Sequence, residues 1–165
     1  MKQSKRRKPD EEDARDPARV RAVALRLLAR REHSSRELTA KLTVRGYEQQ
    51  TVAAVIEALV DRNLLSDTRF VDEFVASRLR RGCGPVKIRE ELRSRGVAES
   101  LVDDTLGDHR SEWLNQAETA RRKRFGTALP KDFNERARQA RFLQQRGYSA
   151  EHIRQVLKGD VELED

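Results

Sequence analysis

The sequence is poor in the residues that build disulfides, tight turns and aromatic cores: its 165 residues include one Cys, four Pro, eight Gly and 5% aromatic residues. The single Cys83 excludes an internal disulfide and fits a reducing compartment. No run approaches the roughly 18 apolar residues of a membrane span, and the charged N-terminus lacks the apolar stretch of a signal peptide. We therefore expect a cytoplasmic protein that does not associate with membranes.

Catalytic and metal-binding patterns are missing as well. His33, His109 and His152 are isolated, without a second His or Cys at metal-ligand spacing. Cys83 lies between two glycines with no His nearby in the sequence, which does not fit an activated nucleophile. Residues 81–85 have no preceding strand and lack the ending of a phosphate-binding loop. We predict a protein that is not an enzyme and needs neither a cofactor nor a metal.

Charge is abundant instead. Asp, Glu, Lys and Arg make up 38% of the residues, and the net charge is +7. The apolar share of 36% suffices for thin interfaces between amphipathic helices rather than for one large core. A positive net charge favours a polyanionic partner, or a protein that itself lies on a polyanion. The alternative is a highly soluble helical protein whose arginines are solvated, and composition leaves both open.

One six-residue pattern occurs three times, at residues 42–47, 92–97 and 143–148. Each copy begins with Leu and ends with an Arg-Gly pair and an apolar residue, and the three glycines stand 50 and 51 residues apart. A helix that ends at a left-handed Gly in a Schellman motif has this register, with the residue after the Gly packed on the helix. Three copies of one helix end predict an internally repeated, all-helical protein.

Helical periodicity and capping signals divide the chain around these three helix ends. Val20, Ala24 and Leu27 share one apolar stripe, for example, and Ser34 and Glu37 have the spacing of a capping box. We predict an all-α protein of three tandem three-helix repeats, at residues 17–64, 65–109 and 110–158, which form an elongated, curved, solenoid-like array.

The ends of the chain and the third repeat depart from this pattern. Residues 1–16 are highly charged and have no apolar stripe to bury, so we predict a disordered N-terminal extension. Residues 159–165 are predicted to form a frayed acidic tail. In the third repeat Gln139 stands where the first two repeats have Leu38 and Ile88, and we expect its second helix to pack differently.

Charge follows the repeats. Lys and Arg outnumber Asp and Glu in residues 17–49, 78–95 and 119–146, whereas the segments between and after them are net acidic. In a stacked array, equivalent helices lie along one edge, so the basic middle helices are predicted to form a stripe. Such a stripe suits binding along a filament or a nucleic acid better than enclosing a small molecule.

Two helices joined by a short Gly-containing turn also fit a helix-turn-helix, and the spacing from Leu38 to Val60 permits one. The helix after the glycine would read the DNA groove, but in the first two repeats this helix is net acidic. Negative charge there opposes binding to phosphates. We therefore favour a protein-binding helical array over sequence-specific DNA recognition.

The central part of the chain contains the sequences LLSDTRFVDEFV at residues 64–75, RGCGPVKIREEL at residues 81–92 and RGV at residues 95–97, with Arg78 between the first two. Together they carry a resemblance to the bacterial RecX family of regulatory proteins. It covers about residues 18–158 and is weakest in the third repeat. It implies three tandem three-helix units and a modulator, usually an inhibitor, of the RecA recombinase.

The resemblance further implies that the protein lodges in the groove of the RecA filament on single-stranded DNA. Binding there would reduce filament growth, ATP hydrolysis, strand exchange and the co-protease activity that triggers the SOS response. End-capping and filament destabilisation both stay open, as does stimulation of RecA in place of inhibition. A monomer is expected, and direct binding to free DNA is expected to be weak. The alternative function is a helical repeat protein that binds nucleic acid without sequence specificity and competes for the single strand.

We expect the contacts with RecA or DNA to come from the basic middle helices. The candidates are Arg36, Lys41 and Arg45 in the first repeat, Arg81, Lys87, Arg89, Arg93 and Arg95 in the second, and Arg121, Arg122, Lys123, Arg124, Arg138 and Arg141 in the third. One alternative is that many of these side chains are solvated or pair with the acidic helices. Another is that Arg45, Arg95 and Arg146, which precede the repeated glycines, satisfy helix-end carbonyls.

Overall fold

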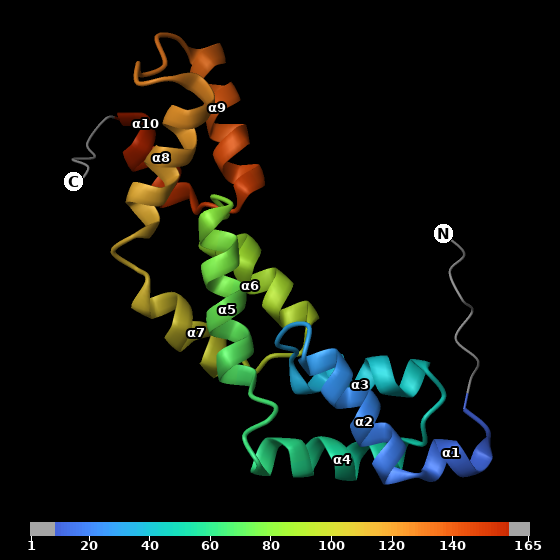
Figure 1. Cartoon of the computed structure of the whole chain (residues 1–165). Helices are drawn as coiled ribbons and strands as arrows, with labels where there is room; N and C mark the ends of the chain where they lie inside the picture. Colours follow the sequence, from blue (N-terminus) through green and yellow to red (C-terminus); the bar gives the residue numbers. More distant parts are fainter. Residues whose placement is uncertain (1–8, 159–165) are drawn as a thin grey trace. The chain divides into compact units, whose positions relative to one another are not determined.

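The computed structural model describes residues 9–158, and this range contains α-helices and no strand (Figure 1). The helices are α1 (Glu11–Arg15), α2 (Pro17–Leu28), α3 (Ser35–Val44), α4 (Gln49–Asp61), α5 (Asp67–Arg80), α6 (Pro85–Ser94), α7 (Glu99–Asp108), α8 (Trp113–Phe125), α9 (Phe133–Arg146) and α10 (Ala150–Lys158). Helices α2–α4, α5–α7 and α8–α10 form three successive three-helix repeats. The prediction of an all-helical, repeated chain is confirmed.

The repeated sequence pattern forms the helix end that it predicts. Gly46, Gly96 and Gly147 have positive φ angles of 97°, 72° and 88°. The N–H of Gly46 donates to the carbonyl of Thr43 at 2.9 Å, and the N–H of the next residue donates to the carbonyl of Leu42 at 3.4 Å. The other two copies contain the same pair of hydrogen bonds. These are the two bonds of a Schellman motif, so one backbone solution ends the middle helix of every repeat.

Two further helix ends share this geometry and were not predicted. After α4, Asn63 has a φ of 54°, its N–H donates to the carbonyl of Val60 at 2.8 Å, and the N–H of Leu64 donates to that of Leu59 at 2.8 Å. After α5, Gly82 has a φ of 68° and the same pair of bonds. Asn adopts the left-handed conformation more readily than other residues with a side chain, which explains its place here.

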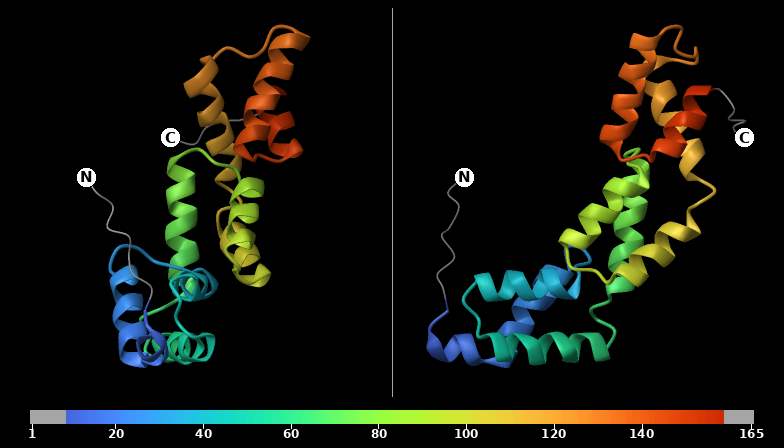
Figure 2. Two further views of the ribbon diagram at one scale, coloured as in Figure 1. Left: turned by 90° about the vertical axis from the view of Figure 1, so that its right-hand side faces the viewer. Right: turned by 180° about the vertical axis from the view of Figure 1, so that it is seen from behind.

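The chain divides into two compact units, residues 1–70 and 71–165, called here the N-terminal unit and the C-terminal unit. In the N-terminal unit α2, α3 and α4 lie together in both views of Figure 2 and enclose one core. Its buried side chains are Val20, Ala24, Leu38, Leu42, Val52, Val55, Leu59 and Leu65. Because the predicted stripe residues lie in this core, amphipathic periodicity accounts for the packing of the first repeat.

The start of α3 is capped by side chains. The Ser34 hydroxyl accepts a hydrogen bond from the N–H of Glu37 at 3.0 Å, as its spacing predicts. Asp67, at the beginning of α5, accepts a second bond from the N–H of Ser35 at 2.7 Å. Two otherwise unpaired N–H groups of the helix terminus are thereby satisfied.

Helix α1 lies in the segment that was expected to be disordered. Asp10 accepts a hydrogen bond from the N–H of Asp13 at 2.9 Å, and the first turn is acidic, which favours the positive end of the helix dipole. Asp13 also pairs with Arg19 of α2 at 2.8 Å. The expectation of disorder is therefore wrong for residues 11–15. Residues 1–8 and the acidic tail at 159–165 lie outside the described part of the chain.

In the C-terminal unit, α6 and α9 meet end to end at two glycines. The N–H of Gly84 donates to the carbonyl of Arg146 at 2.7 Å, and the N–H of Val86 donates to that of Gly147 at 3.0 Å. A Cβ on Gly84 would overlap the carbonyl of Gly147, and one on Gly147 would overlap Lys87. The negative end of the α9 dipole thus packs on the positive end of α6.

Helices α8, α9 and α10 form the third repeat around a small core of their own. Ala117, Ala120, Leu143, Tyr148 and Val156 are buried there. The two residues that α8 buries in this core are alanines, whose small side chains leave room for α9 and α10. Tyr148, the residue after the third repeated glycine, packs into this core as the Schellman register predicts.

Candidate functional site

The candidate cations of the first repeat differ in what holds them. Arg36 is exposed, and its side chain makes no hydrogen bond or ion pair with the described residues. The Lys41 ammonium lies 3.2 Å from a Glu37 carboxylate oxygen and 3.1 Å from Nε2 of His33. Arg45 donates from Nη1 to the carbonyl of Lys41 at 2.8 Å, which agrees with its alternative role at the helix end. Arg36 is therefore the candidate of this repeat whose charge is not already used within the unit.

Lys41 belongs to a partly buried network around His33 and Glu37. Burial opposes ionisation of Glu37, but hydrogen bonds from Arg31 and Lys41 outweigh it and lower the pKa of this carboxyl to about 2. Burial is also the main cause that lowers the pKa of His33. Because Lys41 can only donate, Nε2 of His33 accepts, and Nδ1 donates to the carbonyl of Arg31 at 3.0 Å. This network stabilises the fold of the N-terminal unit.

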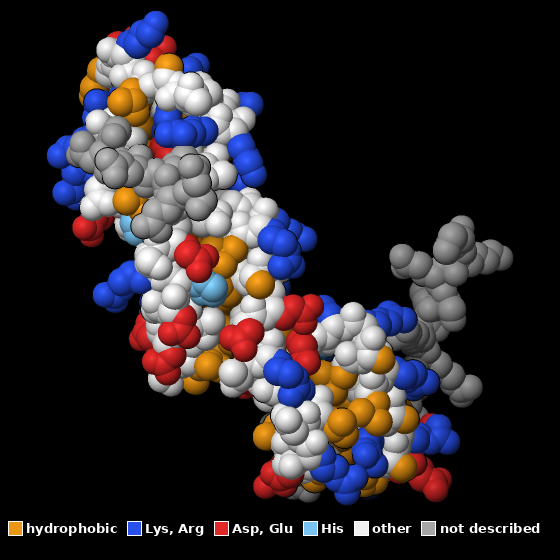
Figure 3. All heavy atoms as spheres, turned by 60° about the vertical axis from the view of Figure 1, so that its left-hand side comes forward, with side chains coloured by type: hydrophobic (Ala, Val, Ile, Leu, Met, Phe, Trp, Pro, Cys, Tyr) orange, Lys and Arg blue, Asp and Glu red, His pale blue; other side chains and the backbone are white. Residues whose placement is uncertain are grey.

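In the second repeat, the basic helix α6 pairs with the acidic helix α7. Arg89 Nη1 lies 2.7 Å from Glu99 and also contacts Asp103. Arg93 forms two hydrogen bonds with Glu99, at 2.6 and 2.8 Å. Hydrogen bonds from Arg93 and Arg89 hold the pKa of Glu99 below its usual value. On the face shown in Figure 3 acidic side chains gather over the part of the C-terminal unit that contains α7. The expected stripe is thus neutralised at these two arginines.

The other candidates of the second repeat fall into two groups. The guanidinium of Arg95 lies 5.1 Å from the ring centre of Phe74, on which Arg78 also packs at 4.4 Å. Arg95 is half-buried, and this cation–π contact gives it a role inside the repeat. Lys87 and Arg81 are exposed, and their side chains make no ion pair within residues 9–158.

In the third repeat the prediction that Arg121 contacts a partner is wrong. Its side chain is 0% exposed, and it forms two 2.9 Å hydrogen bonds with Glu118. It also donates to the carbonyls of Ala128 and Thr127 and to the amide oxygen of Gln139, at 2.9, 3.2 and 3.4 Å. Arg121 therefore holds α8, α9 and the loop between them together. The polar Gln139 at an otherwise apolar position is part of the same cluster.

The remaining cations of the third repeat are accessible. Arg122 pairs with Glu118 at 2.6 Å, and the guanidinium of Arg138 lies 5.5 Å from the ring centre of Phe125. Lys123, Arg124 and Arg141 are exposed and make no ion pair with the described part of the chain. These three keep their full charge available to a partner.

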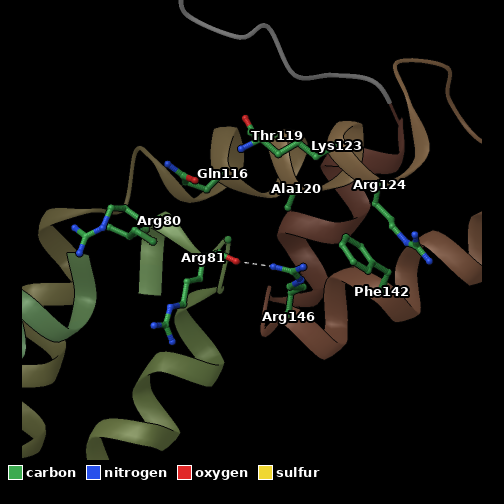
Figure 4. Close-up of a pocket in the computed structure, with 11 residues that line it drawn as sticks. Arg80, Arg81, Gln116, Thr119, Ala120, Lys123, Arg124, Phe142 and Arg146 are labelled. Atoms are coloured by element: carbon green, nitrogen blue, oxygen red, sulfur yellow. Dashed lines mark hydrogen bonds between the residues drawn. The ribbon is translucent and has the colours of Figure 1, made fainter. Parts of the chain in front are cut away.

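A basic pocket in the C-terminal unit brings several of these side chains together (Figure 4). It has a volume of about 310 Å³ and is lined by the end of α5, by α8 and by α9. Its cationic residues are Arg80, Arg81, Lys123, Arg124 and Arg146, and no acidic residue lines it. We refer to this site as the basic pocket.

Sequence reasoning missed Arg80 as a site residue and assigned Arg146 to its own helix end. Arg146 instead donates from Nη1 to the carbonyl of Arg81 at 2.5 Å and packs on Gly82 (Figure 4). The basic residues at the ends of α5, α8 and α9 are visible in the sequence. These helix ends lie close together because Gly84 contacts Gly147, and no local sequence pattern predicts this long-range contact.

The described residues contain no group of three or more His, Cys, Asp or Glu side chains that could hold a metal ion. In the same part of the chain, none of the helices has the length and apolarity needed to cross a membrane.

Comparison with known proteins matches each repeat to a domain of one family. The matches are to RecX, first three-helix domain, at residues 21–59, to its second three-helix domain at residues 66–106, and to its third at residues 111–157. Three domains of one family thus follow one another in order along the chain.

Two proteins named "Regulatory protein RecX" illustrate the sequence similarity. The chain is 51% identical over 135 residues to the one from Halorhodospira halophila, covering 82% of this chain and 84% of the relative. It is 42% identical over 144 residues to that from Ectopseudomonas mendocina, covering 87% and 96%. A crystal structure of RecX from Lactobacillus salivarius superposes with a TM-score of 0.75 at 18% identity, covering 90% of this chain and 96% of the other. This last similarity concerns the fold alone.

Proposed function

Because the chain belongs to the RecX family of regulatory proteins, we propose that it regulates the RecA recombinase by binding the RecA filament on single-stranded DNA. The observation that carries the proposal is the presence of all three RecX three-helix domains, in order, in one chain. We further propose that it acts in the cytoplasm as a monomer and inhibits filament growth. ATP hydrolysis, strand exchange and the co-protease activity that triggers the SOS response would fall with it.

Repetition gives this proposal a physical basis. A filament presents the same protein surface at regular intervals, and a chain with three similar repeats can contact more than one of them. Linked weak contacts add through a high effective concentration, so no single contact needs to be strong. A protein that occupies a growing end also blocks every later addition, which allows action well below the concentration of RecA.

Among the candidate cations named from the sequence, the contacts that we propose are the exposed ones whose side chains make no ion pair, hydrogen bond or cation–π contact with the described residues. They are Arg36 in the first repeat, Arg81 and Lys87 in the second, and Lys123, Arg124 and Arg141 in the third. Their charges are available without breaking an existing ion pair, whereas Lys41, Arg89, Arg93 and Arg122 would each have to leave a carboxylate. Binding through the unpaired cations therefore costs less desolvation and rearrangement.

The test is ATP hydrolysis by RecA on single-stranded DNA, with this protein titrated from far below RecA to an equal concentration. We expect hydrolysis to fall at a small fraction of the RecA concentration and to stay low when more DNA is added. Inhibition that needs near-saturating protein and disappears with excess DNA would support the alternative, competition for the strand. Unchanged hydrolysis in both arms would overturn the proposal.

A further inference from the structure

The basic pocket gathers cations from three helices around a wall without acidic side chains. Arg80 and Arg81 come from the end of α5, Lys123 and Arg124 from the last turn of α8, and Arg146 from the end of α9 (Figure 4). Gln116 and Thr119 of α8 add neutral polar groups to the lining. Together they form a concave, positively charged surface with additional hydrogen-bonding groups.

The charge of this pocket is not compensated within the described residues. Arg80, Arg81, Lys123 and Arg124 are exposed, and none of them forms an ion pair there. On the neighbouring α6, by contrast, Arg89 and Arg93 are held by α7 carboxylates. In Figure 4 the guanidinium groups of Arg80 and Arg124 extend to opposite sides of the pocket, so a bound anion would draw these flexible side chains inward and offset the excess positive charge.

Helix dipoles explain part of this arrangement. Cations in the last turn of α5 and of α8 are each favoured by the negative end of their own helix. The dipole of each helix acts on its own cations only. It therefore does not explain why the ends of α5 and α8 line the same pocket as Arg146. The junction of Gly84 with Gly147 creates this convergence by placing the end of α9 beside the end of α5.

We propose that the basic pocket binds phosphate groups, supplied by a nucleotide or by the backbone of a single-stranded nucleic acid. Guanidinium and ammonium groups are the side chains that recognise phosphate most strongly. A volume of about 310 Å³ accommodates a phosphate with its immediate surroundings, and the pocket is open to solvent on one side. A strand can therefore pass over it, and this inference does not depend on any interaction with RecA.

The Phe142 ring in the pocket already contacts other side chains and is not free to stack on a base. We therefore expect binding that does not depend on the identity of the base. Phe142 packs edge-on against Phe125, with ring centres 5.3 Å apart. The guanidinium of Arg146 lies 5.1 Å from the Phe142 ring centre. Since these contacts use the ring, no platform remains on which a base could stack. Recognition would rest on phosphate, with equal affinity for different bases.

The residues of the pocket divide into one fixed cation and several adaptable ones. Arg146 is held by the Arg81 carbonyl and by Phe142, so its substitution would also disturb the fold. Arg80, Lys123 and Arg124 have no such contact, and their removal changes the charge of the pocket with little effect on packing. They are the residues for a clean test.

The test measures binding of a fluorescent oligo(dT) strand of about 12 nucleotides by anisotropy, with a titration of salt. The pocket variant is Arg80→Gln, Lys123→Gln and Arg124→Gln. The control variant, with the same change in net charge, is Arg21→Gln and Arg26→Gln on α2 with Arg30→Gln in the turn after it, and these side chains are exposed as well. Circular dichroism verifies that both variants keep their helices.

We expect the pocket variant to bind at least about tenfold more weakly and the salt slope to fall by about 2, at about 0.7 per lost phosphate contact. The control variant should stay near the wild type, and an oligo(dA) strand should bind as well as oligo(dT). Equal weakening in both variants would mean that net charge alone binds the strand, and it would overturn the proposal. An unchanged pocket variant would do the same.

Two further experiments complete the test. The first identifies the source of the phosphate, and the second changes the pocket without removing any of its cations. Pyrophosphate and ATP compete with the labelled strand: displacement at low concentrations assigns the pocket to free polyphosphates, and displacement by unlabelled strand alone assigns it to nucleic acid. Thr119→Glu places a carboxylate at the pocket wall, whereas Thr119→Gln is its neutral match. We expect the first to abolish binding and the second to retain it; equal binding by both would contradict the proposal.

Discussion

The middle helices of the first two repeats begin against different neighbours. In the N-terminal unit the start of α3 is capped by two side chains, Ser34 and Asp67. In the C-terminal unit the start of α6 packs directly on backbone, with Gly84 and Gly147 in contact. A side-chain cap can be replaced by another polar group or by water, whereas a backbone contact requires glycine on both sides. Substitutions are therefore tolerated better at the start of α3 in the first repeat than at the start of α6 in the second.

Gly147→Ala should give the largest effect and separate the two kinds of junction. The new methyl group would overlap Lys87, and a positive φ of 88° is unfavourable for Ala. We expect a loss of about 3 kcal/mol in the free energy of unfolding, from overpacking and backbone strain together. Gly46→Ala is the matched control, because Gly46 ends the equivalent helix of the first repeat with the same pair of hydrogen bonds, has a positive φ of 97° and is exposed. It should cost about 1 kcal/mol; equal losses in urea denaturation would refute the close contact.

The ion pairs of the two units offer a second comparison. Arg121→Met leaves Glu118 buried without its main partner, and we expect a loss of about 3 kcal/mol. Arg31→Met in the N-terminal unit removes a pair whose arginine is partly exposed and leaves Glu37 its contact with Lys41, so the loss should be smaller, about 1 to 2 kcal/mol. Urea denaturation of both variants measures the difference. A harmless Arg121→Met substitution would show that the buried cluster does not hold α8 and α9 together.

His33 in one unit is buried and His152 in the other is half-buried, and stability should fall as the pH drops below the ordinary His pKa of 6.5. Burial lowers the pKa of both His33 and His152 in the folded chain. The unfolded chain then binds protons more readily, so the free energy of unfolding decreases below pH 6.5, by at most about 1.4 kcal/mol per pH unit for each histidine.

The variants His33→Gln and His152→Gln separate the two contributions. We expect each to flatten the pH dependence between pH 7 and 5, measured by urea denaturation at several pH values. His33 is joined to Lys41 and to a backbone carbonyl, whereas Nδ1 of His152 has no hydrogen-bond partner among residues 9–158. A pH dependence that neither variant changes would assign the effect to other groups.

Ser34→Ala should have the smallest effect. Loss of one N-cap hydrogen bond costs about 1 kcal/mol, and Asp67 still accepts from the neighbouring N–H of Ser35. The double variant Ser34→Ala, Asp67→Ala should lose more than the sum of the two single variants if the caps replace one another. Strict additivity in urea denaturation would mean that they act independently.

The sequence allowed the backbone of the repeats to be predicted better than their surface chemistry. The Arg-Gly pattern predicted three Schellman motifs because Leu, Gly and the following apolar residue stand in one local register. The burial of Arg121 was not predicted, because four consecutive cations give no sign of which one faces inward. Gln139 was a hint, since a polar residue at a core position needs a buried partner. Likewise, the internal pairing of Arg89 and Arg93 depends on where α7 packs.

Two triple variants, compared in the inhibition of RecA ATP hydrolysis, test whether the unpaired cations contact the filament. Arg36→Gln, Lys87→Gln and Arg141→Gln removes unpaired cations, one from each repeat. Arg89→Gln, Arg93→Gln and Arg122→Gln removes the same charge from cations that already pair with carboxylates. We predict that the first triple variant needs at least about tenfold more protein for half-inhibition, as expected when several linked contacts are lost, and that the second acts like the wild type. Equal inhibition by both variants would contradict the claim that the unpaired cations contact the filament.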